Sequence, residues 1–362
     1  MKNKIPAHGG KVVEAARALG RDWSEIIDFS ANINPLGQPP GLKEALFRDF
    51  DLTLHYPEAD AASLRDGLAV MANLPPTCIM PGAGSTPQLY LICRALDFRA
   101  PAIIGPAFAE YEAALTCGGL KAEYVLTRPD DDWLTTGNTL KRLFEAGPGA
   151  VFLANPANPT GRLTPGDLLL ELADECDRRG IWLIADEAFI DFTGTGHSLL
   201  PLARKNKKLI VLRSLTKIFA LPGLRLAFMA AHPETIGALS PLVEPWSISS
   251  LAVAAGHFCL ARTGFREQSA AAVARLRNTL VQALSELGLG RVFPSESNYV
   301  LLKLRPEIDH QALLTSLFNQ GLLVRDASNF RGLGPGFLRL AVRPESEVEA
   351  LIMALRRALR LA

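Results

Sequence analysis

The sequence predicts an α/β fold, in which a mainly parallel sheet carries helices on both faces and a smaller α+β unit follows. Between about residues 45 and 264, short apolar runs typical of buried strands alternate with helical patterns. This alternation favours parallel strands joined by crossover helices. The expected strands lie at residues 103–104, 125–126, 151–154, 182–185, 210–212 and 226–229, and helices are expected at 108–117 and 164–179.

The C-terminal part of the chain shows a different order of elements. A long helical pattern over about 267–288 leads out of the predicted sheet. The elements expected after it are strands at 298–304, 322–325 and 337–342, a helix at 306–320 and a final helix from Ser346. This mixed order predicts a small α+β unit.

Composition and charge narrow the classes of function. The chain has 362 residues, of which 48% are hydrophobic, and this length exceeds the usual size of one domain. Lys and Arg number 38 against 37 Asp and Glu, without any charge block, so neither nucleic acid nor an anionic membrane is expected as a partner. The sequence shows no membrane-spanning run and no signal peptide.

The cysteines and histidines argue against disulfides and metals. The five cysteines are odd in number and widely spaced without a C-x-x-C pair, which favours a reducing compartment, and we expect the cytoplasm. The histidines other than His8 are isolated and lack the spacing of metal ligands, so no metal site is predicted. The residues concerned are Cys78, Cys93, Cys117, Cys176, Cys259, His55, His197, His232, His257 and His310.

The segment from Ser214 to Arg225 carries the strongest chemical signal. Lys217 follows an apolar, β-branched run at 209–212 and precedes a second apolar stretch. Desolvation in such a place lowers the pKa of the amine, as a lysine that attacks a carbonyl requires. Ser214, Thr216 and Arg225 add two hydroxyls and a fixed charge that suit a phosphate dianion. The alternative is an ordinary surface lysine in a loop, but the combination favours pyridoxal phosphate.

Three other apolar runs, at residues 78–80, 150–154 and 181–185, end in polar residues that suit the same cofactor. Asp186 could pair with a protonated pyridine nitrogen, although an Asp here is also a common helix cap. Asn158 lies in a proline-held loop and could donate a hydrogen bond to the ring oxygen, although an ordinary turn is the alternative. Gly84, Ser85 and Thr86 open a helix whose free N–H groups attract an anion, although one Gly-x-Gly is weak evidence.

These four signals converge on one place in the predicted fold. Ligands of open α/β sheets bind outside the carboxyl ends of the strands. The strand ends of this chain supply an anion cradle, a donor to the ring oxygen, a partner for the pyridine nitrogen and an amine. We therefore expect one cofactor site at that edge of the sheet.

Together the motifs resemble those of the fold-type I aminotransferase family, whose members use pyridoxal phosphate. The matching stretches are residues 158–161, 186–188 and 214–217 and Arg225, which stands eight residues after the lysine. The resemblance covers nearly the whole chain. It implies a large cofactor-binding α/β domain at residues 49–265, and a small α+β domain formed by 1–48 and 266–362.

Within the family, the chain resembles the branch of threonine-phosphate decarboxylases of cobalamin biosynthesis. The stretches that carry this resemblance are 8–10, 28–37, 186–192, 245–248 and 339–343. It implies decarboxylation of L-threonine O-3-phosphate to (R)-1-amino-2-propanol O-2-phosphate. Histidinol-phosphate aminotransferases form the nearest sister branch, and they usually carry a tyrosine where this chain has Phe189.

The resemblance also implies residues for a small phosphorylated amino acid substrate. Arg339 would hold the α-carboxylate and Arg325 the phosphate, because a guanidinium binds both groups in bidentate fashion. Either arginine could equally form a structural salt bridge. The other positions implied to line the substrate pocket are His8, Gly9, Asn32 and Asn158.

Tyr56 matches a family tyrosine that reaches the cofactor phosphate of the neighbouring subunit. This match implies a homodimer with shared active sites. A partly buried tyrosine in a loop is the alternative interpretation.

The residues leave the reaction type open. Lys217 and Asp186 would be the catalytic pair whether the bond to the carboxylate or the Cα–H bond breaks, because the choice depends on which bond stands perpendicular to the cofactor ring. The rival function is therefore a histidinol-phosphate:2-oxoglutarate aminotransferase. A non-catalytic cofactor-binding module is disfavoured, because the predicted fold fills the chain and leaves no room for an appended basic segment.

Overall fold

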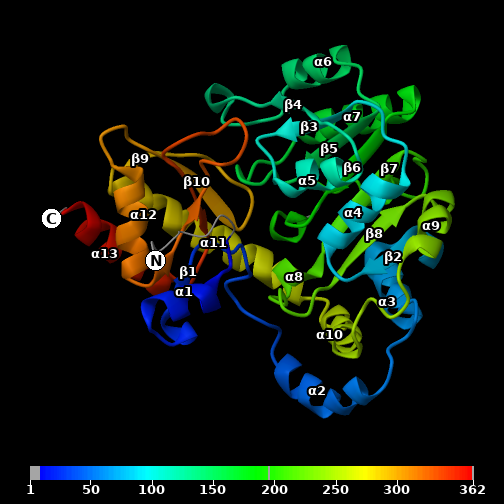
Figure 1. Ribbon diagram of the computed structural model, residues 1–362, viewed down its shortest axis with the longest axis horizontal. Coiled ribbons are helices and arrows are strands. Elements are labelled where there is room, and N and C mark those ends of the chain that lie inside the picture. Colours follow the sequence, from blue (N-terminus) through cyan, green and yellow to red (C-terminus); the bar gives the residue numbers. More distant parts are fainter. Residues whose placement is uncertain (1–8, 195, 361–362) are drawn as a thin grey trace.

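The computed structural model describes residues 9–194 and 196–360, and its larger part is built on a seven-stranded sheet (Figure 1). In spatial order the strands are β2 (Ile79–Gly82), β8 (Ala227–Ala231), β7 (Leu209–Ser214), β6 (Trp182–Asp186), β5 (Ala150–Ala154), β3 (Pro101–Gly105) and β4 (Glu123–Leu126). All neighbours are parallel except β8, which is antiparallel to β2 and β7. The prediction of a mainly parallel sheet is confirmed.

The direction of β8 decides where the strand ends lie. Because β8 is antiparallel to both neighbours, β2 runs in the same direction as the other five strands. Their C-terminal ends therefore share one edge of the sheet. The chain passes from β7 to β8 through the short helix α8 (Leu215–Ile218) and a turn, and a connection without a full crossover helix allows antiparallel neighbours.

Helices cover both faces of this sheet because its strands are apolar on both sides. In β5, Val151 and Leu153 belong to one buried cluster and Phe152 to another, as expected for side chains that alternate between faces. The first cluster, which extends beyond this sheet, includes residues of α3 (Ala62–Ala72), α6 (Gly137–Glu145), α7 (Gly166–Arg179) and α10 (Ser250–Leu260). The second includes residues of α4 (Ser85–Ala95), α5 (Glu110–Cys117) and α9 (Pro233–Leu239).

The smaller region holds two further sheets, drawn on the left in Figure 1. The antiparallel one has the order β12 (Arg325–Asp326), β13 (Phe337–Ala341), β10 (Tyr299–Leu304) and β9 (Gly290–Val292), and the parallel one pairs β1 (Ile27–Asp28) with β11 (Leu322–Leu323). Its helices are α1 (Val12–Leu19), α12 (His310–Asn319) and α13 (Glu345–Leu359).

One predicted strand was wrong in its extent. The expected strand at 322–325 divides at Val324, because residues before it pair with β1 and residues after it pair with β13. The division matters for the site, since it places Arg325 directly opposite Arg339 in the register of β12 and β13.

One long helix connects the two regions, and one early helix packs on the larger region. The long helix α11 (Phe265–Glu286) runs from the large sheet to the small one, where it contacts β9, β10 and α13. The helix α2 (Leu42–Arg48), although early in the chain, lies against α10. None of the helices in the described part of the chain combines the length and the apolar character needed to cross a membrane.

Candidate active site

A cavity of about 390 Å³ opens at the C-terminal edge of the large sheet and is walled on its other side by the small region. It brings together residues from the N-terminal segment, from four strand ends and from β12 and β13. The predicted site residues that line it are Gly9, Asn32, Ser85, Thr86, Asn158, Asp186, Ser214, Thr216, Lys217, Arg225, Arg325 and Arg339.

Three predicted residues do not line this cavity. Gly84 lies behind its wall, where a Cβ atom would stand 2.5 Å from an Nη atom of Arg225. Tyr56 is 82% exposed and packs on Trp246 with ring centroids 5.0 Å apart, away from the cavity of its own chain. His8 lies outside the described residues.

One end of the cavity is suited to a phosphate dianion. Ser85 and Thr86 stand at the first turn of α4, where free N–H groups and the helix dipole favour negative charge. The hydroxyl oxygens of Ser214 and Thr216 lie 2.7 Å apart on the opposite wall. Arg225 completes the group, and its left-handed backbone, with φ of 57°, is a strained conformation typical of functional positions.

Lys217 lies in α8, just beyond the end of β7, and its amine faces the cavity. Burial, assisted by the positive charges of Arg339 and Arg225, lowers the pKa of this amine to about 8. About a tenth of the amine is therefore unprotonated at pH 7, far more than for an ordinary lysine. An unprotonated amine is the form that bonds to the carbonyl carbon of an aldehyde.

Asp186 ends β6 next to this lysine. Its carboxylate accepts a hydrogen bond of 2.6 Å from the Tyr111 hydroxyl and one of 3.0 Å from the Ala188 N–H. Burial raises the pKa of Asp186, and the two hydrogen bonds act against that rise. The sequence did not single out Tyr111, because it falls among the apolar positions of the helical pattern at 108–117 and nothing there marks the direction of its hydroxyl.

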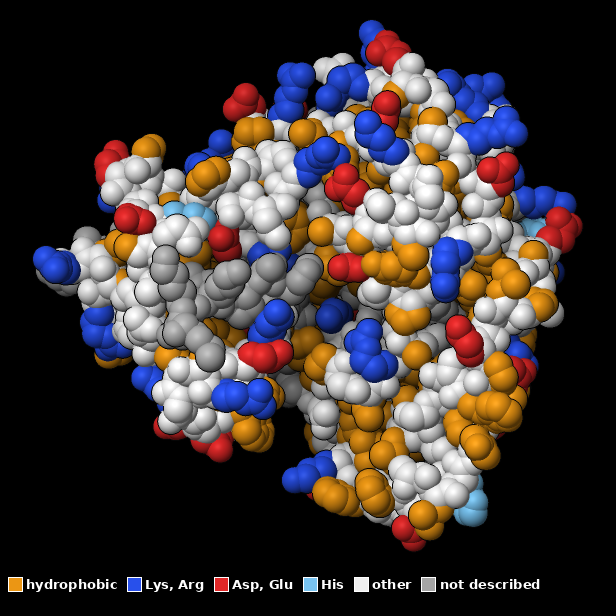
Figure 2. All heavy atoms as spheres, viewed as in Figure 1, with side chains coloured by type: hydrophobic (Ala, Val, Ile, Leu, Met, Phe, Trp, Pro, Cys, Tyr) orange, Lys and Arg blue, Asp and Glu red, His pale blue; other side chains and the backbone are white. Residues whose placement is uncertain are grey.

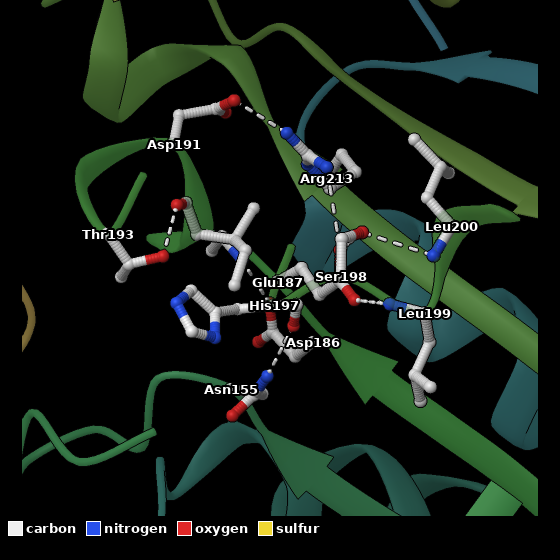
Figure 3. A network of polar contacts seen from close by, with 12 residues as sticks. Asn155, Asp186, Glu187, Asp191, Thr193, His197, Ser198, Leu199, Leu200 and Arg213 are labelled. Carbon is white, nitrogen blue, oxygen red and sulfur yellow. Dashed lines mark hydrogen bonds and ion pairs between the residues drawn. The ribbon is translucent and has the colours of Figure 1, made fainter. Parts of the chain in front are cut away.

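A buried ion-pair network fixes the strand ends behind the site (Figure 3). Glu187, fully buried, accepts a hydrogen bond of 2.5 Å from the Ser198 hydroxyl and lies 3.4 Å from the guanidinium of Arg213. Arg213 in turn lies 2.6 Å from the carboxylate of Asp191. Because Glu187 follows Asp186 and Arg213 belongs to β7, this network holds the ends of β6 and β7 together.

Two buried arginines face each other across β12 and β13. Arg325 and Arg339 are 6% and 7% exposed and lie at the same register position. Burial, together with the charge of Arg325, lowers the pKa of Arg339 to about 10. Like charges placed directly opposite each other destabilise a sheet. An anionic ligand between these guanidinium groups would offset that cost.

Hydrogen bonds orient both arginines. Arg339 donates to Asn158 Oδ1 at 2.6 Å and to the Ser30 carbonyl at 2.8 Å, while its Nε has no partner among the described residues. Arg325 donates to Asn329 Oδ1 at 2.7 Å. Ser30 and Asn329 also line the cavity. Neither could be selected as a site residue from the sequence, since Ser30 contributes a backbone carbonyl and Asn329 lies in a loop.

The donor set fits pyridoxal phosphate. With its Oδ1 taken by Arg339, Asn158 has its amide hydrogens left to donate, as the ring oxygen requires. Asn32 Oδ1 is buried without a partner in the described part of the chain, so the cavity holds an acceptor for a donor on a ligand. Within the described ranges, no group of three His, Cys, Asp or Glu residues could hold a metal ion.

Comparison with known proteins places the chain in a family. The family model described as aminotransferase class I and II matches residues 24–355. The threonine-phosphate decarboxylase of Salmonella typhimurium is 37% identical over 98% of this chain and 96% of its own length. Histidinol-phosphate aminotransferase 2 of Ralstonia nicotianae is 31% identical over 97% of this chain and 93% of its own.

A solved structure has the same fold. The L-threonine-O-3-phosphate decarboxylase of Porphyromonas gingivalis superposes with a TM-score of 0.82 at 26% identity, covering 92% of this chain and all of that one. The predicted aminotransferase fold and its cofactor, pyridoxal 5′-phosphate, are confirmed by these matches. The chain belongs to the aminotransferase class I and II family.

Proposed function

We propose that the protein is a threonine-phosphate decarboxylase, a pyridoxal phosphate-dependent carboxy-lyase. The observation that carries the proposal is the opposed pair Arg325 and Arg339 in the same cavity as Lys217. The pair offers places for two anionic groups beyond the phosphate of the cofactor, and L-threonine O-3-phosphate carries a carboxylate and a phosphate. The name of the Salmonella relative supports the same substrate, and the family resemblance supports a role in cobalamin biosynthesis.

The residues at the strand ends would hold and tune the cofactor. Pyridoxal phosphate supplies an electron sink for the bond that breaks at the substrate Cα. Asp186 would hold a proton on the pyridine nitrogen, because a carboxylate beside that atom stabilises its positive charge. Asn158 would donate to the ring oxygen. The residues proposed for the cofactor phosphate are Gly84, Ser85, Thr86, Ser214, Thr216 and Arg225.

The substrate groups would be oriented from the opposite wall. Arg339 binds the carboxylate and Arg325 the phosphate, with Gly9, Asn32 and His8 closing the pocket. Two fixed anchors restrict rotation about Cα, and orientation is what selects decarboxylation over removal of the α-proton. Lys217 then delivers a proton to Cα. Its lowered pKa lets the same amine be proton donor and free base near neutral pH.

We also propose a homodimer in the cytoplasm. Large apolar side chains lie exposed around α2, in the lower part of the molecule in Figure 2, and such patches mark interfaces. In a dimer, Tyr56 would reach the cofactor phosphate of the neighbouring subunit. The free cysteines favour a reducing compartment. The exposed residues of the patch are Phe47, Phe50, Leu52, Leu54 and Tyr56.

The domain division proposed for this function follows the resemblance, with residues 49–265 binding the cofactor. Residues 1–48 and 266–362 would form the small domain that selects the substrate. The two arginines of β12 and β13 support this assignment, because they come from the second of these segments.

The test compares two substrates with one protein. Purified protein with cofactor is incubated with L-threonine O-3-phosphate labelled at C1, and released CO2 is counted; a parallel sample contains histidinol phosphate and 2-oxoglutarate, and glutamate is measured. We expect CO2 release that persists in Lys207→Ala, a surface lysine paired with Glu234, and is lost in Lys217→Ala. Rapid glutamate formation without CO2 release would assign the aminotransferase function instead.

A further inference from the structure

The short helix that carries Lys217 takes part of the hydrogen bonds at its C-terminal end from a remote segment. The last carbonyls of any α-helix have no partner within the helix, and α8 is only four residues long. The N–H groups that directly follow α8 donate to three of its carbonyls, among them that of Lys217 at 3.3 Å from the Ala220 nitrogen. The N-terminal segment adds a second donor to the Lys217 carbonyl and supplies the donor to the Ile218 carbonyl. The backbone N–H of Asn34 donates to the Lys217 carbonyl at 3.1 Å, and its Nδ2 donates to the Ile218 carbonyl at 2.7 Å.

Asn34 is itself held rigidly. It is 2% exposed, and its Nδ2 donates a second hydrogen bond of 2.8 Å to the Ser269 hydroxyl in α11. Ser269 donates its own hydrogen to the Phe265 carbonyl at 2.6 Å, so its oxygen is free to accept from Asn34. The Oδ1 of Asn34 accepts from the Leu36 N–H at 3.0 Å. Every polar group of this side chain is therefore in use.

We propose that Asn34 is a positioning residue for the Lys217 amine. It fixes the C-terminal end of α8 against α11, and with it the point from which the lysine side chain enters the cavity. The proposal rests on the role proposed above for Lys217. The same segment supplies the Ser30 carbonyl to Arg339 and the wall at Asn32, so one stretch of chain sets the relative placement of the amine and the carboxylate anchor.

Removing the Asn34 amide leaves the end of α8 without a donor. Among the described residues, Asn34 is the side-chain donor to the Ile218 carbonyl, and this carbonyl would lose it in a buried place, where an unpaired carbonyl is unfavourable. The end of α8 would then move to find another partner. A misplacement of about 1 Å in a reacting group lowers rates by about 100-fold, so a small movement of this helix has a large effect on chemistry.

The test uses two asparagines in matched surroundings. Asn206 is also buried, its Nδ2 donates to the Ala173 carbonyl at 3.3 Å and its Oδ1 accepts from the Lys208 N–H at 2.8 Å. It precedes the opposite end of β7 from Lys217. We would compare Asn34→Ala and Asn206→Ala, together with Asn34→Asp, which keeps the size and the acceptor for Leu36 but removes the donor.

For each variant, the urea midpoint of unfolding reports on stability. The Kd for pyridoxal phosphate, from absorbance, and the fraction of Lys217 captured by borohydride reduction report on cofactor binding. The kcat and KM for CO2 release report on the reaction. In both Asn34 variants we expect the cofactor Kd to rise and kcat to fall by about tenfold or more, with KM changed by less than about threefold. Asn206→Ala should change the cofactor Kd and kcat by less than about twofold.

Equal effects of the Asn34 and Asn206 substitutions on cofactor Kd would overturn the proposal. So would unchanged cofactor Kd and kcat in a folded Asn34 variant, or unfolding of both Asn34 variants while Asn206→Ala stays folded, since Asn34 would then be only structural. Failure of the proposed decarboxylase function would give a different result from failure of the role proposed for Asn34. Unmodified protein would release no CO2, while cofactor Kd and Lys217 capture would still report on Asn34.

Discussion

The two halves of the cavity are built in different ways. In the cofactor half, Asp186, Ser214 and Lys217 follow directly from neighbouring strands of one sheet, whose ends are aligned by the parallel ladder. In the substrate half, Arg325 and Arg339 meet through an antiparallel pairing of remote segments, and Arg339 is tied to Ser30 from the N-terminal segment. The first half is set by local sequence and the second by tertiary pairing, so substitutions in the two halves should affect different measured quantities.

The largest expected effect concerns the cofactor half and its buried amine. In the cofactor-free protein Lys217 loses its proton at a pKa of about 8, against 10.5 in the unfolded chain. Between pH 8 and pH 10.5 the unfolded chain therefore binds a proton that the folded protein does not. Because of this, the free energy of unfolding rises with pH over this range, by roughly 3 kcal/mol for Lys217. Below pH 8 the buried charge destabilises the fold. Lys217→Met should remove the rise, as seen in urea titrations at several pH values.

Lys207→Met serves as the control for that titration, because the Lys207 amine is exposed and paired with Glu234 at 2.9 Å. It should keep the pH-dependent rise. A rise of the same size in Lys217→Met would contradict the desolvation of Lys217.

The next effect belongs to the substrate half. Arg339→Ala should lower kcat/KM for L-threonine O-3-phosphate by about 100-fold, because a charge-assisted bidentate contact to the carboxylate is lost. The cofactor Kd should change by less than about threefold, since Arg339 touches the proposed cofactor groups only through Asn158 and the phosphate groups come from the other half. Arg343→Ala is the control, as Arg343 pairs with Glu347 on α13. A large rise in cofactor Kd in Arg339→Ala would show that the two halves are not separable.

Gly84→Ala should weaken cofactor binding and leave substrate binding unchanged, which is the reverse of the result expected for Arg339→Ala. The added Cβ would stand 2.5 Å from Arg225, at a backbone φ of 103° that residues other than glycine rarely adopt. We expect the cofactor Kd to rise by about tenfold while KM for the substrate stays nearly unchanged. Gly166→Ala, at the start of α7 with open space around its Cβ position, should leave both quantities unchanged. An unaffected cofactor Kd in Gly84→Ala would remove Arg225 from the phosphate site.

The smallest expected effect tests the support behind Asp186. Tyr111→Phe removes the hydrogen bond of 2.6 Å to the carboxylate, and the pKa of Asp186, already raised by burial, should rise further. We expect kcat to fall by about fivefold, with the acid limb of its pH profile moved to higher pH. Tyr124→Phe, which loses a hydrogen bond of 3.2 Å to Glu112, is the control. An unmoved acid limb would contradict a role for Tyr111.

Features set by local sequence could be predicted, whereas features set by tertiary pairing could not. The strand ends at Asp186 and Lys217 were predictable, because an apolar run followed by a polar residue marks both the strand and its end. The division at Val324 was not, since the apolar run continues through the point where the chain changes sheets. The contacts of Tyr111 and Asn34 were missed because a hydrogen bond across 75 or 184 residues leaves no local pattern.

For Phe189, the sequence shows the residue type but not where its ring lies. Its substitution for the usual tyrosine was visible in the sequence. The structure adds that its ring lies edge-on to Tyr299 with centroids 5.1 Å apart and lines the cavity. The hydroxyl of Tyr299 instead donates to the Ala157 carbonyl at 2.9 Å.

The decisive experiment measures how a single turnover divides between decarboxylation and transamination. Protein saturated with cofactor is mixed with C1-labelled L-threonine O-3-phosphate, and released CO2 and pyridoxamine phosphate are quantified in the same sample. If the two arginines orient the substrate for decarboxylation, CO2 should account for nearly every turnover and pyridoxamine phosphate should stay at trace level. Pyridoxamine phosphate formed in proportion to substrate consumed, without CO2, would contradict the account.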